Sequence, residues 1–202
     1  MRFFSSPRLI QLLFPKWIWK GPENNVIYLT FDDGPTPEST PYILELLKKH
    51  NIKASFFCLG ERALSSPELI QQIVGDGHSI GNHTMHHENG WKTKRETYLE
   101  SIEQSAALID SKLFRPPYGK IRLSQSKKLR ELGYKIILWT WMSYDFDKSI
   151  SASEIISKSR KIKGGDILVF HDNVKANERT KEVLPSLIKS VIEQGCRFKT
   201  LS

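Results

Sequence analysis

Short apolar runs alternate with amphipathic helical patterns along nearly the whole chain, and this alternation limits the fold more than any other feature. About seven of the runs are typical of strands, at 26–33, 54–59, 78–82, 113–114, 134–141, 166–170 and 196–200. Helical patterns lie between them, at 40–50, 67–75, 93–109, 124–133, 151–162 and 183–192. We therefore predict an α/β protein with a parallel sheet, which is either an open doubly wound sheet or a closed barrel.

Local signals predict where several helices begin and end. Ser or Thr followed three residues later by Glu forms a capping box at 93–96 and at 151–154, so helices are expected to begin there. Pro185 is compatible with the last helix only near its start. The polar stretch 172–180 is predicted to be a mobile loop.

Composition argues against nucleic acids and nucleotides as partners. The net charge is +8, from 30 Lys and Arg residues against 22 Asp and Glu, but the basic residues are spread over many segments. No Gly-rich phosphate loop follows any predicted strand, so nothing indicates nucleotide binding. Cys58 and Cys196 lie far apart and are expected to be free thiols, which gives no indication of an oxidising compartment.

Residues 1–23 are predicted to form an amphipathic segment packed on a domain that spans 24–202. A short helix can begin after Ser6 and Pro7 and end before Pro15. The segment has no small-residue cleavage site of a signal peptide, and no stretch approaches the ~20 apolar residues that a spanning helix needs. A cytoplasmic or peripherally membrane-associated location is therefore favoured.

The N-terminal segment has a second interpretation, which is contact with a membrane surface. Trp17 and Trp19 flank Ile18, and Lys16 and Lys20 lie on either side of them. Aromatic and basic side chains in this arrangement are typical of segments that lie in a bilayer interface. We keep a peripheral membrane contact through residues 1–20 as the alternative to simple packing.

Two adjacent carboxylates, Asp32 and Asp33, end the first apolar run. Carboxylates at the end of a buried strand require a metal, a cationic partner or a proton. Neighbouring side chains on a strand point to opposite faces, and the bend expected at Gly34 and Pro35 would let both reach one cavity. One carboxylate on a metal and one used for proton transfer is the functional interpretation; a capping Asp before an ordinary turn is the alternative.

Further polar residues follow later strands, and the carboxyl ends of parallel strands are where α/β proteins place their chemistry. His83, His86 and His87 follow the third strand, and imidazole together with carboxylate favours Zn²⁺ or a similar ion. Spacing alone leaves open whether His86 or His87 is the partner of His83.

Arg115, Asp145 and His171 complete the set of strand-end residues. Arg115 is either an exposed side chain of a rigid loop or a guanidinium that holds and orients a carboxylate. His171 is either a core histidine or a general acid whose pKa and tautomer are set by Asp145. Each residue alone is weak support, but their joint placement after successive strands indicates a hydrolytic site.

Over roughly residues 24–200 the chain resembles the NodB-homology polysaccharide deacetylases, carbohydrate esterase family 4. Five stretches carry the resemblance in order: TFDDGP at 30–35, HTMHH at 83–87, RPPYG at 115–119, WMSYDF at 141–146 and VFH at 169–171. The resemblance implies a distorted (β/α)7-type barrel, NodB-like in its topology. Three positions depart from the usual pattern, Phe146, Val169 and Glu88, and of these Phe146 and Val169 are expected to affect the fit of the substrate, Val169 through the apolar pocket for the acetyl methyl.

The resemblance also implies roles for individual residues. The metal ligands would be Asp33, His83 and His87, with His86 as the variable position. Asp32 would be the catalytic base, and Arg115 would contact it. The backbone N–H of Tyr118 would help to hold the oxyanion. His171 would be the general acid, and Asp145 would tune it.

The implied reaction is metal-dependent hydrolysis of N-acetyl groups on amino-sugar units of a glycan. A divalent metal, Zn²⁺ first and Co²⁺ or Ni²⁺ as alternatives, would polarise the acetyl carbonyl and bind the attacking water. The alternatives are a related amidase or O-deacetylase that acts on a small molecule, and an inactive glycan-binding homologue.

Overall fold

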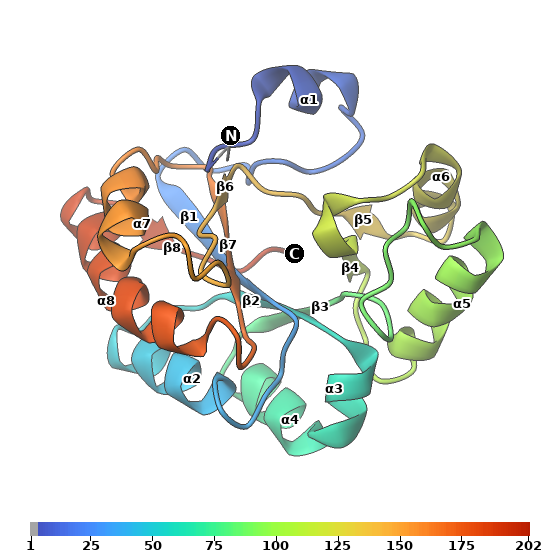
Figure 1. Cartoon of the computed structure of the whole chain (residues 1–202), viewed down its shortest axis with the longest axis horizontal. Helices are drawn as coiled ribbons and strands as arrows, with labels where there is room; N and C mark the ends of the chain where they lie inside the picture. The colour runs from blue at the N-terminus through green and yellow to red at the C-terminus, as the bar shows by residue number, and fades with distance from the viewer. Residues whose placement is uncertain (1–3) are drawn as a thin grey trace.

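The computed structural model describes residues 4–202, and its centre is one curved parallel sheet (Figure 1). Seven strands follow one another across the sheet in the order β5-β4-β3-β2-β1-β7-β6, and β8 pairs with β1 outside this path. Within the described residues every paired strand runs parallel to its neighbour. The strands are β1 (Val26–Asp32), β2 (Ser55–Cys58), β3 (Ser79–Asn82), β4 (Leu113–Phe114), β5 (Lys135–Ile136), β6 (Trp141–Met142), β7 (Ile167–His171) and β8 (Arg197–Phe198).

The two ends of the sheet come from consecutive parts of the chain, which makes the fold a distorted barrel as predicted. The run at 134–141 was expected to be one strand, and this expectation is wrong, because only its two ends join the sheet. The residues between them pair with the N-terminal segment instead: Ile18 N–H donates to Ile136 O at 2.8 Å, and Leu138 N–H donates to Ile18 O at 2.8 Å. The gap between β5 and β6 is thus bridged by residues that precede the first strand.

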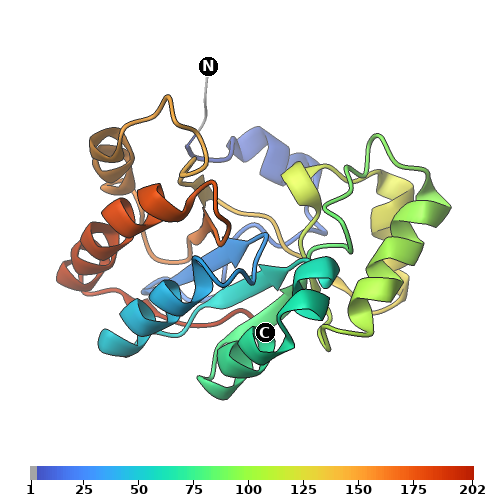
Figure 2. The same cartoon turned by 60° about the horizontal axis from the view of Figure 1, so that its bottom comes forward.

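Helices cover the outside of the curved sheet (Figures 1 and 2). The structure contains α1 (Arg8–Leu13), α2 (Thr40–Lys49), α3 (Gly60–Ser65), α4 (Pro67–Gly75), α5 (Arg95–Ala106), α6 (Leu123–Glu131), α7 (Ala152–Ser159), α8 (Asn177–Glu193) and the 3₁₀ turn η1 (Pro117–Gly119). The short helix predicted after Pro7 is α1. Helix α3 was not predicted, because it buries only Gly60 and Ala63 and therefore shows no apolar periodicity.

The core lies on both faces of the central strand. All seven residues of β1 are buried, as expected for a parallel strand covered on both sides. Phe31 stacks on Phe56 of β2 with ring centroids 5.0 Å apart and lies 6.2 Å from Phe170 of β7. Truncating such a residue to Ala typically costs about 3–5 kcal/mol of stability. The strands β1, β2 and β7, which lead to the candidate site, are therefore joined by a buried aromatic cluster.

Local helix signals were only partly correct. The Ser151 side chain accepts a hydrogen bond from Glu154 N–H at 3.1 Å, which confirms this N-cap. The capping box at 93–96 is wrong, because the Thr93 hydroxyl donates to Asn89 O and α5 begins only after Lys94. Pro185 lies well inside α8 rather than near its start, because that helix already begins at Asn177.

The stretch 172–180 is not the mobile polar loop that its composition predicted. Asp172 and Thr180 are both buried, and the Asp172 N–H donates to Asp32 O at 2.7 Å. The last part of this stretch is the first turn of α8. Asp172, Asn173 and Thr180 face inward and contact residues of the candidate site, whereas Lys175 and Glu178 are exposed.

The N-terminal segment from Phe4 to Lys20 follows the surface of the barrel. Trp17 Nε1 donates to Ser126 Oγ of α6 at 2.7 Å, and Ser6 N–H donates to Thr140 O at 2.9 Å. Among residues 4–202 no helix is long and apolar enough to cross a bilayer.

Candidate active site

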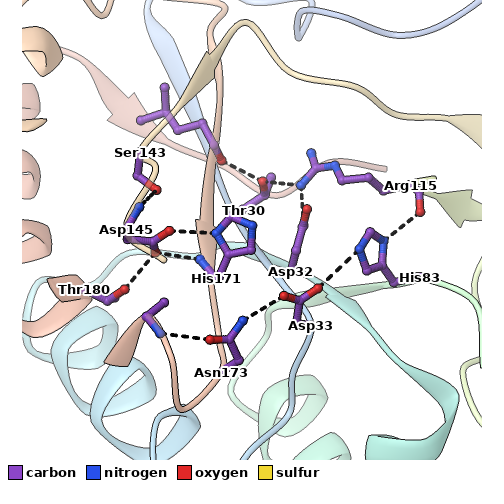
Figure 3. A network of polar contacts seen from close by, with 12 residues as sticks. Thr30, Asp32, Asp33, His83, Arg115, Ser143, Asp145, His171, Asn173 and Thr180 are labelled. Carbon is purple, nitrogen blue, oxygen red and sulfur yellow. Dashed lines mark hydrogen bonds and ion pairs between the residues drawn. The ribbon is translucent and has the colours of Figure 1, made fainter. Parts of the chain in front are cut away.

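The strand-end residues meet around one cavity of about 550 Å³ at the carboxyl edge of the sheet. Strands β1, β3 and β7, which lead to Asp32, His83 and His171, are close in the sheet order, so residues far apart in the chain reach the same space. Figure 3 shows their side chains converging on this space. The cavity is lined on one side by Asp33 and His87 and on the other by aromatic side chains such as Phe146.

Three of these residues form a group with the geometry of a metal site. One ligand atom from each of Asp33, His83 and His87 lies within 4.8 Å of the other two. Asp33 Oδ1 is 3.5 Å from His83 Nε2 and 3.2 Å from His87 Nε2. This oxygen is buried and accepts no hydrogen bond from any described residue. An oxygen that lacks a donor and faces two imidazole nitrogens fits a cation between them.

The surroundings prepare two of the ligands for this task. His83 Nδ1 lies 2.7 Å from Arg115 O, which assigns the proton to Nδ1 and leaves the Nε2 lone pair free. Burial alone would raise the pKa of Asp33, but the adjacent imidazoles of His83 and His87 outweigh it, and the pKa lies well below its ordinary value. The adjacent imidazoles therefore favour the anionic carboxylate, which is the form that binds a cation.

The backbone turns at Asp33 itself, one residue before the predicted bend at Gly34 and Pro35. Asp33 has φ +76°, whereas β1 ends at Asp32 in extended conformation. This left-handed conformation brings the Asp33 side chain into the cavity that Asp32 also reaches. His87 and Tyr118 have φ +61° and +60°, and such conformations in non-glycine residues concentrate at functional sites.

Asn173 is a site residue that the sequence reasoning missed. Its Nδ2 donates to Asp33 Oδ2 at 2.8 Å, and its Oδ1 accepts from Ala176 N–H at 2.9 Å. The amide thus fixes the second oxygen of the Asp33 carboxylate, so that Oδ1 is the one left for a cation. A signal was present, because Asn173 lies two residues beyond His171 at the end of the same strand.

His86 does not belong to this group. Its side chain is exposed, and its Nδ1 lies 2.9 Å from Glu61 Oε2. The ambiguity between His86 and His87 is therefore resolved in space by the turn at His87, which directs that ring toward Asp33.

The second carboxylate, Asp32, is held by Arg115 inside the barrel. Arg115 Nη1 lies 2.6 Å from Asp32 Oδ1 and 2.6 Å from Thr30 Oγ1. The guanidinium is wholly buried and lies over the Phe57 ring, 4.0 Å from its centroid. Burial lowers the pKa of Arg115, and the Asp32 charge opposes that change. The interpretation of Arg115 as an exposed loop residue is thus wrong.

On the opposite side of the cavity, His171 is held by Asp145. His171 Nδ1 lies 2.7 Å from Asp145 Oδ1, and His171 N–H donates to Asp145 Oδ2 at 2.8 Å. The Thr180 hydroxyl, another residue that was missed, donates to Asp145 Oδ2 at 2.8 Å. Burial alone would lower the pKa of His171, but Asp145 together with Asp33 and Asp32 raises it to about 9.

Three further predicted positions, Tyr118, Phe146 and Val169, differ in how they lie relative to the cavity. The Tyr118 ring is exposed, lines the rim and meets the His87 ring edge-on at 4.5 Å. Phe146 lines the cavity and lies edge-on to His171 at 4.7 Å. Val169 is wholly buried within β7 and does not itself line the cavity, so its effect on the fit of the substrate stays a prediction.

A family model described as polysaccharide deacetylase matches residues 20–137. The chain belongs to the polysaccharide deacetylase family. It is 34% identical over 192 residues to a peptidoglycan-N-acetylglucosamine deacetylase of Bacillus cereus, a match that covers 91% of this chain and 90% of the relative. The predicted family, and with it the class of hydrolase, is thereby confirmed.

Solved structures of this polysaccharide deacetylase family share the fold. The Bc1960 peptidoglycan N-acetylglucosamine deacetylase superposes with a TM-score of 0.89 at 32% identity, over 97% of this chain and 95% of that one. A pseudoenzyme of the family from Bacillus anthracis superposes with a TM-score of 0.78 at 27% identity, over 91% and 66% of the two chains. Because a pseudoenzyme has the same fold, the fold alone does not indicate activity, and the residues of the site are decisive.

Proposed function

We propose that this polysaccharide deacetylase removes N-acetyl groups from amino-sugar residues of a glycan, with N-acetylglucosamine units of peptidoglycan as the first candidates. One observation carries the proposal: Asp32 and His171 line the same cavity as the three candidate ligands Asp33, His83 and His87. A base, an acid and a cation site around one space are the groups that amide hydrolysis requires. The similarity to peptidoglycan deacetylases supports this choice of substrate.

The donor set supports a divalent metal, with Zn²⁺ as the first candidate. Two imidazole nitrogens and one carboxylate oxygen are a common ligand set for catalytic zinc, which keeps positions open for reactants. Co²⁺ and Ni²⁺ accept the same ligands. A divalent cation bound by these residues supplies Lewis acidity at the acetyl carbonyl.

Asp32 is proposed to act as the general base. Its Oδ1 is held by Arg115, and its position on β1 directs the carboxylate to the cavity. In this role it accepts a proton from the water that attacks the acetyl carbon. Arg115 does not contact the reactants; it positions the carboxylate and compensates its charge inside the barrel.

The tetrahedral intermediate requires a donor for its oxyanion, and we assign this to the backbone N–H of Tyr118. Tyr118 adopts a left-handed conformation at the cavity rim, where its ring meets the ring of the candidate ligand His87. A fixed backbone donor costs no reorganisation when charge develops, which is why such donors are effective in acyl transfer.

His171 is proposed to act as the general acid. Because Nδ1 is bound by Asp145, Nε2 is the atom that can donate a proton into the cavity. The C–N bond breaks as the amine nitrogen takes this proton. The acetyl carbon keeps the oxygen of the attacking water and is released as acetate. The products are acetate and the free amine of the sugar.

The test is acetate release by protein reconstituted with Zn²⁺, measured on peptidoglycan fragments, chitooligosaccharides, lipid-linked amino sugars and a panel of small amides and O-acetyl esters. Release from N-acetylated glycans, lost on chelation and restored by Zn²⁺ or Co²⁺, supports the proposal. Release from small amides or O-acetyl esters alone would replace it with the amidase or esterase alternative. Protein that holds metal and binds glycan but releases no acetate from any substrate would show an inactive homologue.

A further inference from the structure

Helix α1 carries an apolar surface that nothing in the described chain covers. Its four aliphatic side chains, Leu9, Ile10, Leu12 and Leu13, are 69%, 41%, 76% and 64% exposed. None of its six residues is buried. In Figure 1, α1 stands apart from the helices that cover the sheet. Aliphatic side chains concentrated in this way on a surface indicate an interaction site.

The helix is nevertheless fixed to the body of the protein. Phe14 stacks on Trp17 with ring centroids 4.2 Å apart, and Trp19 Nε1 donates to Phe14 O at 3.1 Å. Trp17 is bound to Ser126 of α6, and Ile18 forms a parallel bridge with Ile137. These contacts fix the exposed leucines of α1 relative to the rest of the protein. A partner that binds them is therefore held in a defined orientation to the protein.

The charged residues of the segment that contains α1, residues 4–20, are all basic. Arg8 at its start and Lys16 after its end are exposed, and Lys20 pairs with Asp166 at 3.6 Å. The first acidic residue of the whole chain is Glu23, and the net charge is +8. An apolar patch with basic neighbours and no acidic ones in its segment complements an apolar surface that carries negative charge.

We propose that this patch, the α1 surface of Leu9, Ile10, Leu12 and Leu13 with Arg8 and Lys16, docks on an anionic lipid bilayer. Apolar side chains would enter the interface while the basic ones face lipid phosphates. A second protein is the poorer fit, because a stable interface needs about 800 Å² from each partner, which six residues do not provide. Tryptophans directly behind the helix are also typical of bilayer interfaces.

Docking would place the cavity close to the bilayer. Met142, which lines the cavity, donates through its N–H to Phe4 O at 2.9 Å. Arg8 follows Phe4 by four positions, so α1 begins within about 15 Å of this point. That docking brings the active site close to glycan at the membrane rests on the proposed function. The docking itself does not depend on that function.

The experiment uses the 202-residue chain and phosphatidylcholine vesicles with or without about 30% phosphatidylglycerol. This fraction gives the vesicles a negative surface charge roughly like that of a natural membrane. Sedimentation with vesicles is measured for the wild type and for a variant with Leu9→Glu, Leu12→Glu and Leu13→Glu. The matched control carries Leu64→Glu, Val74→Glu and Ile192→Glu, three exposed aliphatic residues outside α1 with the same change in charge.

We expect the wild type and the control to bind the anionic vesicles and the α1 variant to bind at least about tenfold more weakly, with binding that decreases as salt rises. Arg8→Ala with Lys16→Ala should weaken binding to anionic vesicles only. Failure of the wild type to bind, equal loss in the control, or a dimer that only the α1 variant disrupts would overturn the proposal. Acetate release from soluble chitooligosaccharide should be the same in all four proteins, which separates docking from catalysis.

Discussion

Arg115 and Asp32 form an ion pair of 2.6 Å inside the barrel, where the guanidinium is wholly buried and the carboxylate is 4% exposed. The same guanidinium binds Thr30 and lies over Phe57, so it joins β1, β2 and β4 beneath the cavity. A buried charge that loses its partner is strongly destabilising, because neither water nor another ion compensates it. The pair therefore links the proposed chemistry to the stability of the fold.

Replacing Arg115 should weaken the fold as well as the activity. We expect Arg115→Met to lower the free energy of unfolding by about 3–5 kcal/mol, since it leaves Asp32 buried without its partner. Urea unfolding measures this. The control is Arg122→Met, which removes an exposed arginine bound only to Trp91 O and should change stability little. Equal stability of the two variants would contradict the importance of the pair.

Asp32→Asn should separate metal binding from catalysis. We expect acetate release to fall by about 10²–10⁴-fold, the usual contribution of a general base, while the variant still binds one metal ion through Asp33, His83 and His87. Metal content by elemental analysis and acetate release are measured on the same sample. A variant that keeps most of its activity would exclude Asp32 as the base.

Substitution of the two neighbouring histidines, His86 and His87, should have different effects on metal binding. His87→Ala removes a proposed ligand and is expected to abolish stoichiometric metal binding, whereas His86→Ala removes only an exposed contact with Glu61 and should leave it intact. Metal titration monitored by calorimetry distinguishes the two. Loss of metal in the His86 variant with retention in the His87 variant would reverse the assignment.

Asn173 should contribute to metal affinity without being a ligand. Removing a residue that orients a ligand typically costs about 10–100-fold in affinity, so we expect Asn173→Ala to lose metal to a chelator at correspondingly lower concentrations. Asn177→Ala is the matched control, because its amide donates only to Glu38 O. Identical chelator titrations for the two variants would show that the Asn173 contact has no such effect.

The pH profile of the reaction should depend on Asp145. Since the pKa of His171 is raised to about 9, the imidazolium needed as acid is present below that pH and is lost as pH rises through it. Without the Asp145 charge the pKa should fall, so Asp145→Asn should move the alkaline limb of kcat to lower pH. The same shift stabilises the folded protein below the ordinary histidine pKa, and this contribution disappears toward pH 9. An unmoved limb would show that another group titrates there.

Two features of this protein could be predicted from its sequence: the regular alternation of strands and helices, and the polar residues that gather after successive strands. The alternation of strands and helices indicated a parallel sheet, and strand ends then placed Asp32, His83 and His171 in one site. Asn173 follows β7 by two residues and could have been included by the same rule, but nothing in the sequence shows that it pairs with Asp33. Thr180 could not be found in this way, because it lies in the first turn of a helix and its partner Asp145 is far away in the chain.

The remaining errors arise from contacts that no local pattern records. The run at 134–141 has the composition of one strand, yet its middle residues pair with Ile18, which precedes every strand of the sheet. Composition also predicted that 172–180 is a polar, mobile loop, although Asp172 and Thr180 are buried beside Asp32 and Asp145. In both cases the tertiary partner, and not the segment itself, determines the structure.

The pairing of Phe4 and Ser5 with β6 has a practical consequence for protein engineering. Strand β6 is the last of the sheet order, and Ser5 forms an antiparallel bridge with Trp141 while Phe4 O accepts from Met142 N–H. An uncovered edge strand is a template for pairing with other chains and so promotes aggregation. Truncating the N-terminus to remove the apolar helix α1 would also remove Phe4 and Ser5 and so expose the edge of β6. A chain shortened in this way should therefore precipitate more readily than one with point substitutions in α1.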